Sequence, residues 1–337
     1  MNYCGIDIAN KSSSICIIDS DGNTLYRTEV ETESGDIGQA LTGFGPLKVM
    51  IEASPLAETI ATIVESYGHT VVIIDARAAK NLMSSMKKTD RRDAQTLAEI
   101  GRCGWYREVH RKSPEARELR SLLRARQALL KSNKALTFSI RGLLRAHGIR
   151  LGKVSEGKFA EAVSLITAQQ APALLPALTA MLEVLTLAGR QAKQLKKDLE
   201  ARCQQDAVSQ RFESVPGIGP LISTAYRATI DNPHRFRHGE EIADYLGLAP
   251  RVYQSGEVEY RGRISKEGDR LLRWHLVEGA HVLLTKGRDC ALKRWGLSLE
   301  KRKGSAKAKV AVARKLAILL WKLWKDEQWF EPFPQTV

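Results

Sequence analysis

The sequence predicts an α/β domain in the first third of the chain and a longer, mainly helical part after it. Three observations lead to this fold class. Short β-rich runs alternate with helix-compatible segments up to about residue 75, as in a sheet with crossover connections. Long amphipathic stretches with helical periodicity begin near residue 111. The chain has 337 residues, 43% hydrophobic and 27% charged, which suits two or three globular domains.

The first three apolar runs are predicted to form an antiparallel meander, because only short connections separate them. They lie at residues 3–8, 14–18 and 24–30, with the turn Asp21-Gly22-Asn23 before the third. A helix near 35–43, a strand at 48–52, a helix near 56–67 and a strand at 70–74 follow. Strands that alternate with helices form right-handed parallel units. A meander followed by such units is the order of elements in ribonuclease H-like domains.

Carboxylates occupy unusual positions in these elements. Asp7 interrupts the first apolar strand, and Glu52 ends the apolar strand 48–52. Asp90 and Asp93 are three residues apart in a predicted helix that continues to Ile100, so they share one helix face. Each residue also has an ordinary interpretation. Asp7 and Glu52 could be solvated strand ends, and either Asp90 or Thr89 could be the N-cap of the helix.

Taken together, the four carboxylates predict a metal site for phosphate chemistry. Several oxygen ligands favour Mg²⁺ or Mn²⁺. Two such ions about 3.5–4 Å apart can stabilise the attacking and leaving oxygens of a phosphodiester exchange.

The charge of the chain is unevenly distributed. The formal net charge is +14. Residues 1–110 contain 11 Lys/Arg and 15 Asp/Glu, a net −4, so the remaining 41 Lys/Arg and 23 Asp/Glu give +18. An acidic module followed by a basic one suits metal-binding carboxylates joined to a surface that binds nucleic acid.

Cytoplasmic localisation and no membrane partner are expected. The five cysteines are scattered, without the spacing of zinc ligands or redox pairs, which is typical of reduced structural thiols. Asp7 interrupts the first apolar run, so no signal peptide is expected. The most apolar stretch, residues 171–189, contains two prolines and Glu183 and is interpreted as a buried helix.

A long basic helix is predicted between Pro114 and Gly148. Residues 111–153 contain twelve Lys/Arg and only two acidic residues. A solvated basic face is the ordinary interpretation, but this excess favours contacts with nucleic-acid phosphates. The expected contacts are Arg117, Arg120, Arg124, Lys131, Lys134, Arg141 and Arg145. A second amphipathic helix, at about 178–208, could pair with the first as an antiparallel arm or join a dimer interface.

The C-terminal third contains a glycine turn and a serine-containing loop. The turn at 215–219 is similar to a helix-hairpin-helix, in which Gly217 and Gly219 let backbone N–H groups approach a phosphate; an ordinary turn between helices is the alternative. Further on, Ser255 lies in a loop surrounded by cations, and it is either a turn serine or a nucleophile. Tyr253 and Tyr260 rank lower as nucleophiles. The cations expected to bind nucleic acid there are Arg251, Arg261, Arg263 and Lys266.

Taken jointly, these motifs resemble a known family. They are Gly5-Ile6-Asp7, Ile51-Glu52-Ala53, Lys88-Thr89-Asp90 through Asp93-Ala94, the turn at 215–219, and Gly247 to Pro250 through Ile264-Ser265-Lys266. The chain resembles the insertion-sequence transposases of the IS110 family, including its IS1111 branch, and the related Piv-type DNA invertases.

The resemblance implies a domain at 1–110 that is RuvC-like, with Asp7, Glu52, Asp90 and Asp93 as its metal ligands. It also implies a coiled-coil region at 111–208 and a transposase domain at 209–337 whose serine attacks DNA and forms a covalent phosphoserine. Ser255 is the expected nucleophile. Because Gln254 stands where the family often has another serine, Ser265 is the second choice.

The family resemblance also implies partners. These are DNA, a structured noncoding RNA that guides the reaction, and further copies of the chain in a dimer or tetramer, in which the two sites come together across subunits. Two other functions are weighed beside this one. They are a hydrolytic RuvC-like nuclease, in which Ser255 only binds, and a nonenzymatic RNA- or DNA-binding protein.

Overall fold

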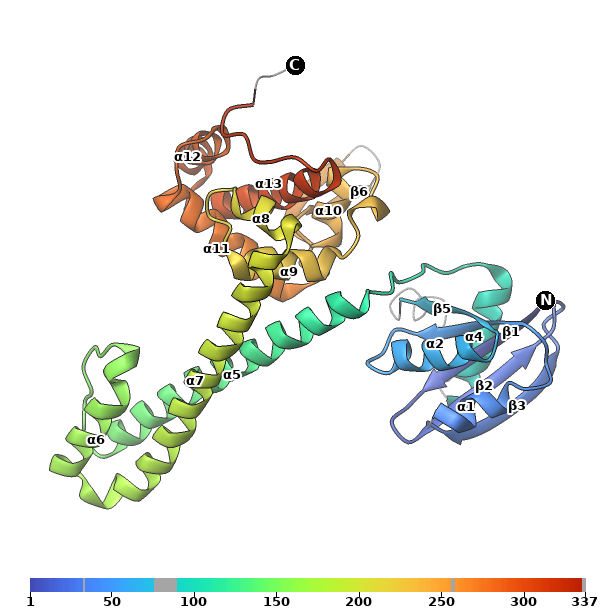
Figure 1. Ribbon diagram of the computed structural model, residues 1–337, viewed down its shortest axis with the longest axis horizontal. Helices are drawn as coiled ribbons and strands as arrows, with labels where there is room; N and C mark the ends of the chain where they lie inside the picture. The colour runs from blue at the N-terminus through green and yellow to red at the C-terminus, as the bar shows by residue number, and fades with distance from the viewer. Residues whose placement is uncertain (33, 76–89, 256–257, 335–337) are drawn as a thin grey trace. The chain divides into compact units, whose positions relative to one another are not determined.

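The computed structural model describes the chain except residues 33, 76–89, 256–257 and 335–337, and it describes only the backbone of residues 34, 90–92, 252–255 and 258–261. The chain divides into two compact units, Met1–Lys112 and Ser113–Val337, and each is described by itself (Figure 1). The boundary lies close to the one at 110 expected from the sequence, and the second expected boundary, at 208, lies inside the second unit. The first unit is α/β and the second is mostly helical, so the predicted fold class is confirmed at this level.

The first unit contains a five-stranded sheet in the order β3-β2-β1-β4-β5. Its strands are β1 (Asn2–Ile8), β2 (Ser12–Ile18), β3 (Thr24–Glu31), β4 (Leu47–Glu52) and β5 (Thr70–Ile74). β1, β2 and β3 pair antiparallel, whereas β4 is parallel to both β1 and β5. The predicted meander and parallel units are therefore confirmed.

Helices cover both faces of this sheet. On one face, α1 (Ser34–Ala40) and α2 (Ala57–Ser66) pack against strand residues such as Ile6, Val49 and Ile51. On the other face lies α4 (Asp90–Cys103), whose Leu97 and Ile100 pack against Met50 of β4. Alternate strand residues point to opposite faces, so the two apolar sets form separate cores.

The second unit begins with two long helices that pair antiparallel (Figure 1). They are α5 (Pro114–Ala146) and α7 (Leu175–Gln205), with α6 (Phe159–Gln170) packed beside α7. Leu199 lies in one core with the start of α5, and Leu178 lies in another with Leu144 near its end. An ion pair of 2.7 Å between Arg202 and Glu118 joins the two helices. The antiparallel pairing considered from the sequence is therefore formed within one chain.

One helical stretch, Pro172–Gln205, is long and apolar enough to cross a membrane by length and composition alone. Leu182, Leu185 and Ala188 of this stretch are buried, but Val184 and Leu187 are exposed. The buried helix expected here is therefore buried along one stripe only.

The rest of the second unit is a helical domain with a two-stranded hairpin. Its main core combines Phe212, Tyr226 and Trp324 in edge-to-face ring contacts. The elements are α8 (Ala207–Glu213), α9 (Pro220–Ile230), α10 (Gly239–Tyr245), β6 (Pro250–Ser255), β7 (Val258–Ile264), α11 (Arg270–Lys286), α12 (Ala291–Lys303) and α13 (Ser305–Lys325), with short 3₁₀ turns at Glu156–Lys158, Pro172–Leu174 and Pro233–Arg235.

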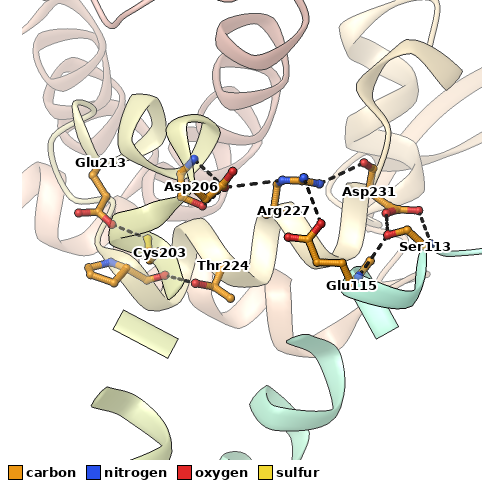
Figure 2. Close-up of polar contacts among 11 residues, drawn as sticks. Ser113, Glu115, Cys203, Asp206, Glu213, Thr224, Arg227 and Asp231 are labelled. Atoms are coloured by element: carbon orange, nitrogen blue, oxygen red, sulfur yellow. Dashed lines mark hydrogen bonds and ion pairs between the residues drawn. The ribbon is translucent and has the colours of Figure 1, made fainter. Parts of the chain in front are cut away.

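A polar network joins the start of α5 to this domain (Figure 2). The Asp231 carboxylate, just after α9, accepts hydrogen bonds from the backbone N–H and the hydroxyl of Ser113, at 3.0 and 2.6 Å. Arg227 of α9 lies 3.7 Å from Glu115 and 3.6 Å from Asp206. Ser113 and Asp206 are also the N-caps of α5 and α8. The network therefore fixes where both helices begin.

Candidate functional site

Asp7 and Glu52 lie at the carboxyl ends of neighbouring parallel strands. The register pairs Ile6 of β1 with Ile51 of β4, and each carboxylate residue follows directly. Across the antiparallel neighbour, Asp7 pairs with Ser14 of β2, which is buried. Both Asp7 and Glu52 are half-buried. The two acidic residues, 45 positions apart in the sequence, are thus adjacent in the sheet.

The pleat directs both carboxylates to the face that α4 covers. Asp7 is two residues beyond Gly5, which lies against α4, and Glu52 is two residues beyond Met50, which packs on the same helix. Residues two apart in a strand point to the same face. Asp7 and Glu52 therefore share a face with α4 and not with α1 and α2.

The direction of α4 brings its first turn to the same edge of the sheet. A Cβ added to Gly5 would overlap the carbonyl oxygen of Ala94 and lie 2.6 Å from the backbone nitrogen of Ala98. Further along α4, a Cβ on Gly101 would lie 2.5 Å from Cγ of Met50 and 3.7 Å from Cδ1 of Tyr3. The helix therefore runs antiparallel to β1. Its first turn, which precedes Ala94, extends past Gly5 toward Asp7.

Asp93 belongs to that first turn of α4 and is half-buried. The backbone of Asp90 begins the helix, but its side chain lies outside the described residues, as does Thr89. Among the described side chains, no group of three or more His, Cys, Asp or Glu is close enough to hold a metal ion. The four-carboxylate ligand set thus remains a prediction, supported by the placement of Asp7, Glu52 and α4.

The residues present suit a divalent cation. Two half-buried carboxylates lie on adjacent strands, and a helix bearing a third begins at the same edge. Carboxylate oxygens are hard ligands of the kind that Mg²⁺ prefers. Carboxylates held close together in partly buried positions repel each other unless a cation or proton lies between them.

Asp75 was not singled out from the sequence. It directly follows β5, and its backbone N–H donates to the carbonyl of Arg107 at 3.3 Å. Because β4 and β5 are parallel, Asp75 lies at the same edge of the sheet as Glu52. The signal was available, since Asp75 follows an apolar strand just as Glu52 ends one.

Replacing Gly5 by Ala is expected to lower the free energy of unfolding by about 2–3 kcal/mol, because the new methyl group overpacks the contact between β1 and α4. Moving α4 away from the sheet would also displace Asp93, so DNA strand exchange should fall. Denaturant unfolding measures the first effect. Gly35→Ala is the matched control, since a Cβ there meets nothing within 4 Å. An unchanged unfolding midpoint for Gly5→Ala would contradict the close approach of the helix.

The serine segment, which the sequence analysis interpreted as a loop, forms a β-hairpin. In the β6–β7 ladder, Tyr253 pairs with Tyr260 and Ser255 pairs with Val258. Ser255 is therefore the last residue of β6, next to residues 256–257, which lie outside the described part. Glycines and arginines in this segment interrupt the alternating apolar pattern that predicts a strand. The hydrogen-bonded pairing between β6 and β7 stabilises the strands despite their low β-propensity.

Backbone hydrogen bonds join the base of this hairpin to a neighbouring turn. The backbone N–H of Ser265 donates to Ala249 at 2.9 Å, and that of Lys266 donates to Gly247 at 3.1 Å. Gly247 has φ +65°, and a Cβ there would overlap the carbonyl oxygen of Glu267. Arg273 of α11 donates to the carbonyls of Leu246 and Glu267 and so bridges the two segments. Burial lowers the pKa of Arg273.

The two candidate serines differ in place. Ser255 ends β6 near the tip of the hairpin, whereas Ser265 follows β7 at the base. The Ser265 hydroxyl accepts a weak hydrogen bond of 3.4 Å from the backbone of Glu267, and its carbonyl accepts one of 3.2 Å from Arg251. Ser265 therefore has structural contacts at the base. Arg251, Arg263 and Lys266 are exposed; the side chain of Arg261 lies outside the described residues.

The predicted phosphate contacts on α5 fall into two groups. Arg120 is engaged internally, 2.9 Å from Asp269, and Arg141 donates to the carbonyls of Leu151 and Gly152. These two arginines therefore make contacts within the fold. Arg124, Lys131, Lys134 and Arg145 are exposed, and Arg117 is half-buried. Helical spacing alone could not separate the groups, because the partners of Arg120 and Arg141 come from elsewhere in the chain.

Gly217 has a packing role in addition to the phosphate contact predicted for it. Its φ is +90°, and a Cβ there would overlap the carbonyl oxygen of Gly279 and lie 3.0 Å from the backbone nitrogen of Leu283. The turn therefore packs closely on α11. Gly219 precedes α9, and a Cβ there would meet nothing within 4 Å. Phosphate binding by the two glycines remains a prediction.

The chain is similar to known transposases along most of its length. The transposase family DEDD_Tnp_IS110 matches residues 4–149, and the family described as Transposase IS116/IS110/IS902 matches residues 209–295. The transposase for insertion sequence element IS1111A from Coxiella burnetii is 31% identical over 95% of this chain and 88% of the relative. A "Probable family 20 transposase" from Pseudomonas aeruginosa is 30% identical over 98% and 99%. The transposase for IS1328 from Yersinia enterocolitica is 26% identical over 94% and 95%.

These matches cover both the candidate metal ligands of the first unit and the hairpin of the second unit. The DEDD family match includes Asp7, Glu52, Asp90 and Asp93, and a domain of this kind implies the use of a divalent metal ion. The second match includes the β6–β7 hairpin. DNA is the substrate of such enzymes, which cleave DNA and transfer its strands in transposition. The chain belongs to the IS110/IS116/IS902 family of transposases.

Proposed function

We propose that this transposase exchanges DNA strands through a covalent intermediate on Ser255, with Mg²⁺ or Mn²⁺ held by Asp7, Glu52, Asp90 and Asp93, and with a structured noncoding RNA that selects the DNA. The observation that carries the proposal is the juxtaposition of Asp7 and Glu52 on adjacent parallel strands, on the face that α4 covers. A bound divalent ion would neutralise phosphate charge and lower the pKa of an attacking hydroxyl.

The chemistry assigned to Ser255 is a transesterification that needs no oxidant or external energy source. Its hydroxyl oxygen forms a bond to a DNA phosphorus, and the bond from that phosphorus to one DNA oxygen breaks. The departing DNA oxygen takes up a proton, and the serine hydroxyl loses one. A DNA hydroxyl from another strand then attacks the phosphoserine, releases the serine and completes the exchange. Cations near the hairpin would stabilise the charge that develops on the phosphoryl oxygens.

The rest of the molecule is proposed to hold nucleic acid largely through phosphates. Exposed α5 cations such as Arg124, Lys131 and Arg145 fit this role, as do Arg251 and Lys266. Contacts to phosphates carry little sequence information, so base pairing with an RNA would supply the specificity. The enzyme is further proposed to act as a homo-oligomer, a dimer or tetramer.

The RNA part of the proposal is tested by sequencing the RNA that co-purifies with the full-length protein. We expect one discrete species, with loops complementary to the insertion site and to the end of the element. Strand exchange reconstituted with that RNA should follow when a loop and its DNA target are changed together. An enzyme that exchanges strands with no discrete RNA bound would contradict guidance while leaving the serine chemistry standing.

A further inference from the structure

A second strongly basic surface lies where α12 meets α13. Lys301, Arg302 and Lys303 end α12, Gly304 makes the turn with φ +83°, and Lys307 and Lys309 follow in the first turns of α13. These five cations are called the 301–309 patch. Four of them are exposed and Lys309 is half-buried, and no acidic residue interrupts the segment. The patch also lies beyond residues 209–295, which match the transposase family.

Several other cations of α12 and α13 differ because they have partners. Arg294 pairs with Asp289, Arg314 pairs with Glu240, and Lys315 lies 4.7 Å from the ring centre of Trp295. Within the part of the chain that the structure describes, no hydrogen bond or ion pair engages a side chain of the 301–309 patch. The cations of the patch are therefore unpaired within the described residues, although Glu300 directly precedes them in α12.

The helix dipole explains three of the five cations of the patch. Lys301, Arg302 and Lys303 are favourably placed at the C-terminus of α12, where cations stabilise a helix. Lys307 is placed unfavourably, in the first turn of α13, which has no acidic residue and no side-chain cap. Five like charges in nine residues also repel one another. Among the described residues Lys307 has no partner, and it opposes the dipole of α13, so a bound anion is the better explanation for it.

The patch rests on a rigid base. Ala308 and Val312 of α13 are fully buried, and a Cβ on Gly296 of α12 would lie 2.7 Å from Val312 and 2.7 Å from Leu284. The two helices therefore pack closely behind the patch, and its cations are presented on fixed backbone. Binding a partner through these cations therefore costs less conformational entropy than binding it through a flexible tail.

We infer that the 301–309 patch is a docking surface for the phosphate backbone of duplex DNA. Charge complementarity favours a polyanion, and DNA is the polyanion on which this family of enzymes acts. Backbone contact of this kind adds affinity without sequence preference and holds DNA against the C-terminal domain. The inference depends on DNA as the substrate, but not on Ser255, the carboxylates or the guide RNA of the proposed function.

The test is the salt dependence of binding by the full-length protein, cleared of nucleic acid, to a short duplex of arbitrary sequence. A chelator is present so that no chemistry occurs. One variant carries three substitutions, Lys303→Gln, Lys307→Gln and Lys309→Gln. It should reduce the slope of the logarithm of the binding constant against the logarithm of the salt concentration by about three, because each phosphate contact contributes about 0.9. Affinity should fall on the order of a hundredfold at ~0.1 M salt. The thermal midpoint should stay nearly equal, because removing Lys307 from the N-terminus of α13 offsets removing Lys303 from the C-terminus of α12.

The matched control removes three other cations of α12 and α13, each of which already has a partner. Arg294→Gln, Arg314→Gln and Lys315→Gln lower the net charge equally, and they should change the slope by less than about one. Equal slopes for the two triple variants would overturn the inference, because net charge alone would then explain the loss. A patch variant that binds duplex DNA like the wild type but binds RNA less tightly would also overturn it, because RNA would then be the occupant.

Discussion

Replacing Asp7 by Asn is expected to abolish DNA cleavage and strand exchange while leaving DNA binding nearly unchanged. The substitution preserves the shape of the side chain and removes one negative charge from the edge of the sheet where Glu52 lies. Loss of one charged ligand weakens the hold on a divalent ion, whose contribution to the transition state is several kcal/mol. The expected fall in rate is therefore about 10³-fold or more.

The measurement is single-turnover strand exchange at saturating protein, with binding followed separately by fluorescence anisotropy. Asp36→Asn is the matched control. Asp36 is exposed in the first turn of α1, on the other face of the sheet, and the same change there should leave the rate within about twofold. An Asp7→Asn enzyme with wild-type activity would refute the metal-site interpretation. A wild-type protein that binds DNA but shows no metal-dependent chemistry would favour the nonenzymatic alternative.

The strands of the first unit were predictable to within two residues at each end, because the sequence patterns that define them are local. Each strand is a short apolar run, and the turns between the first three strands leave only an antiparallel arrangement. The predicted strand at 48–52 is β4 with one residue added, and that at 70–74 is β5. The sequence also placed acidic residues at strand ends. It could not show that Asp7 and Glu52 are neighbours, because that depends on the register between β1 and β4.

The second unit was less predictable, because its important contacts are between distant segments. Arg120 has the same helical spacing as Arg124, yet Asp269 from the start of α11 engages only Arg120 by an ion pair. The β6–β7 hairpin was missed because its strands are rich in polar residues, and their ladder forms only when the two strands meet. The 301–309 patch was missed for a different reason. Its charges are evident in the sequence, but their lack of partners is a property of the fold.

Replacing Ser255 by Ala is expected to eliminate both the covalent protein–DNA adduct and strand exchange, with DNA affinity within about twofold of the wild type. Removal of a nucleophile leaves no alternative atom at the same place, so a loss on the order of 10⁴-fold or more is expected. The matched control is Ser265→Ala at the base of the hairpin. Its hydroxyl makes a local contact with the backbone of Glu267, so the loss should be small.

Each outcome of this pair of variants distinguishes one chemistry from another. An adduct that disappears with Ser255→Ala and persists with Ser265→Ala identifies the serine at the end of β6. The opposite result makes Ser265 the nucleophile, and an adduct that survives both points to Tyr253 or Tyr260, which a phosphoamino-acid analysis would identify. Metal-dependent cutting by the wild type with no adduct at any time would mean that water attacks, as in a hydrolytic nuclease. In that case Asp7→Asn would still abolish cutting while Ser255→Ala would not, so the two variants together separate a metal-dependent nuclease from a serine transposase.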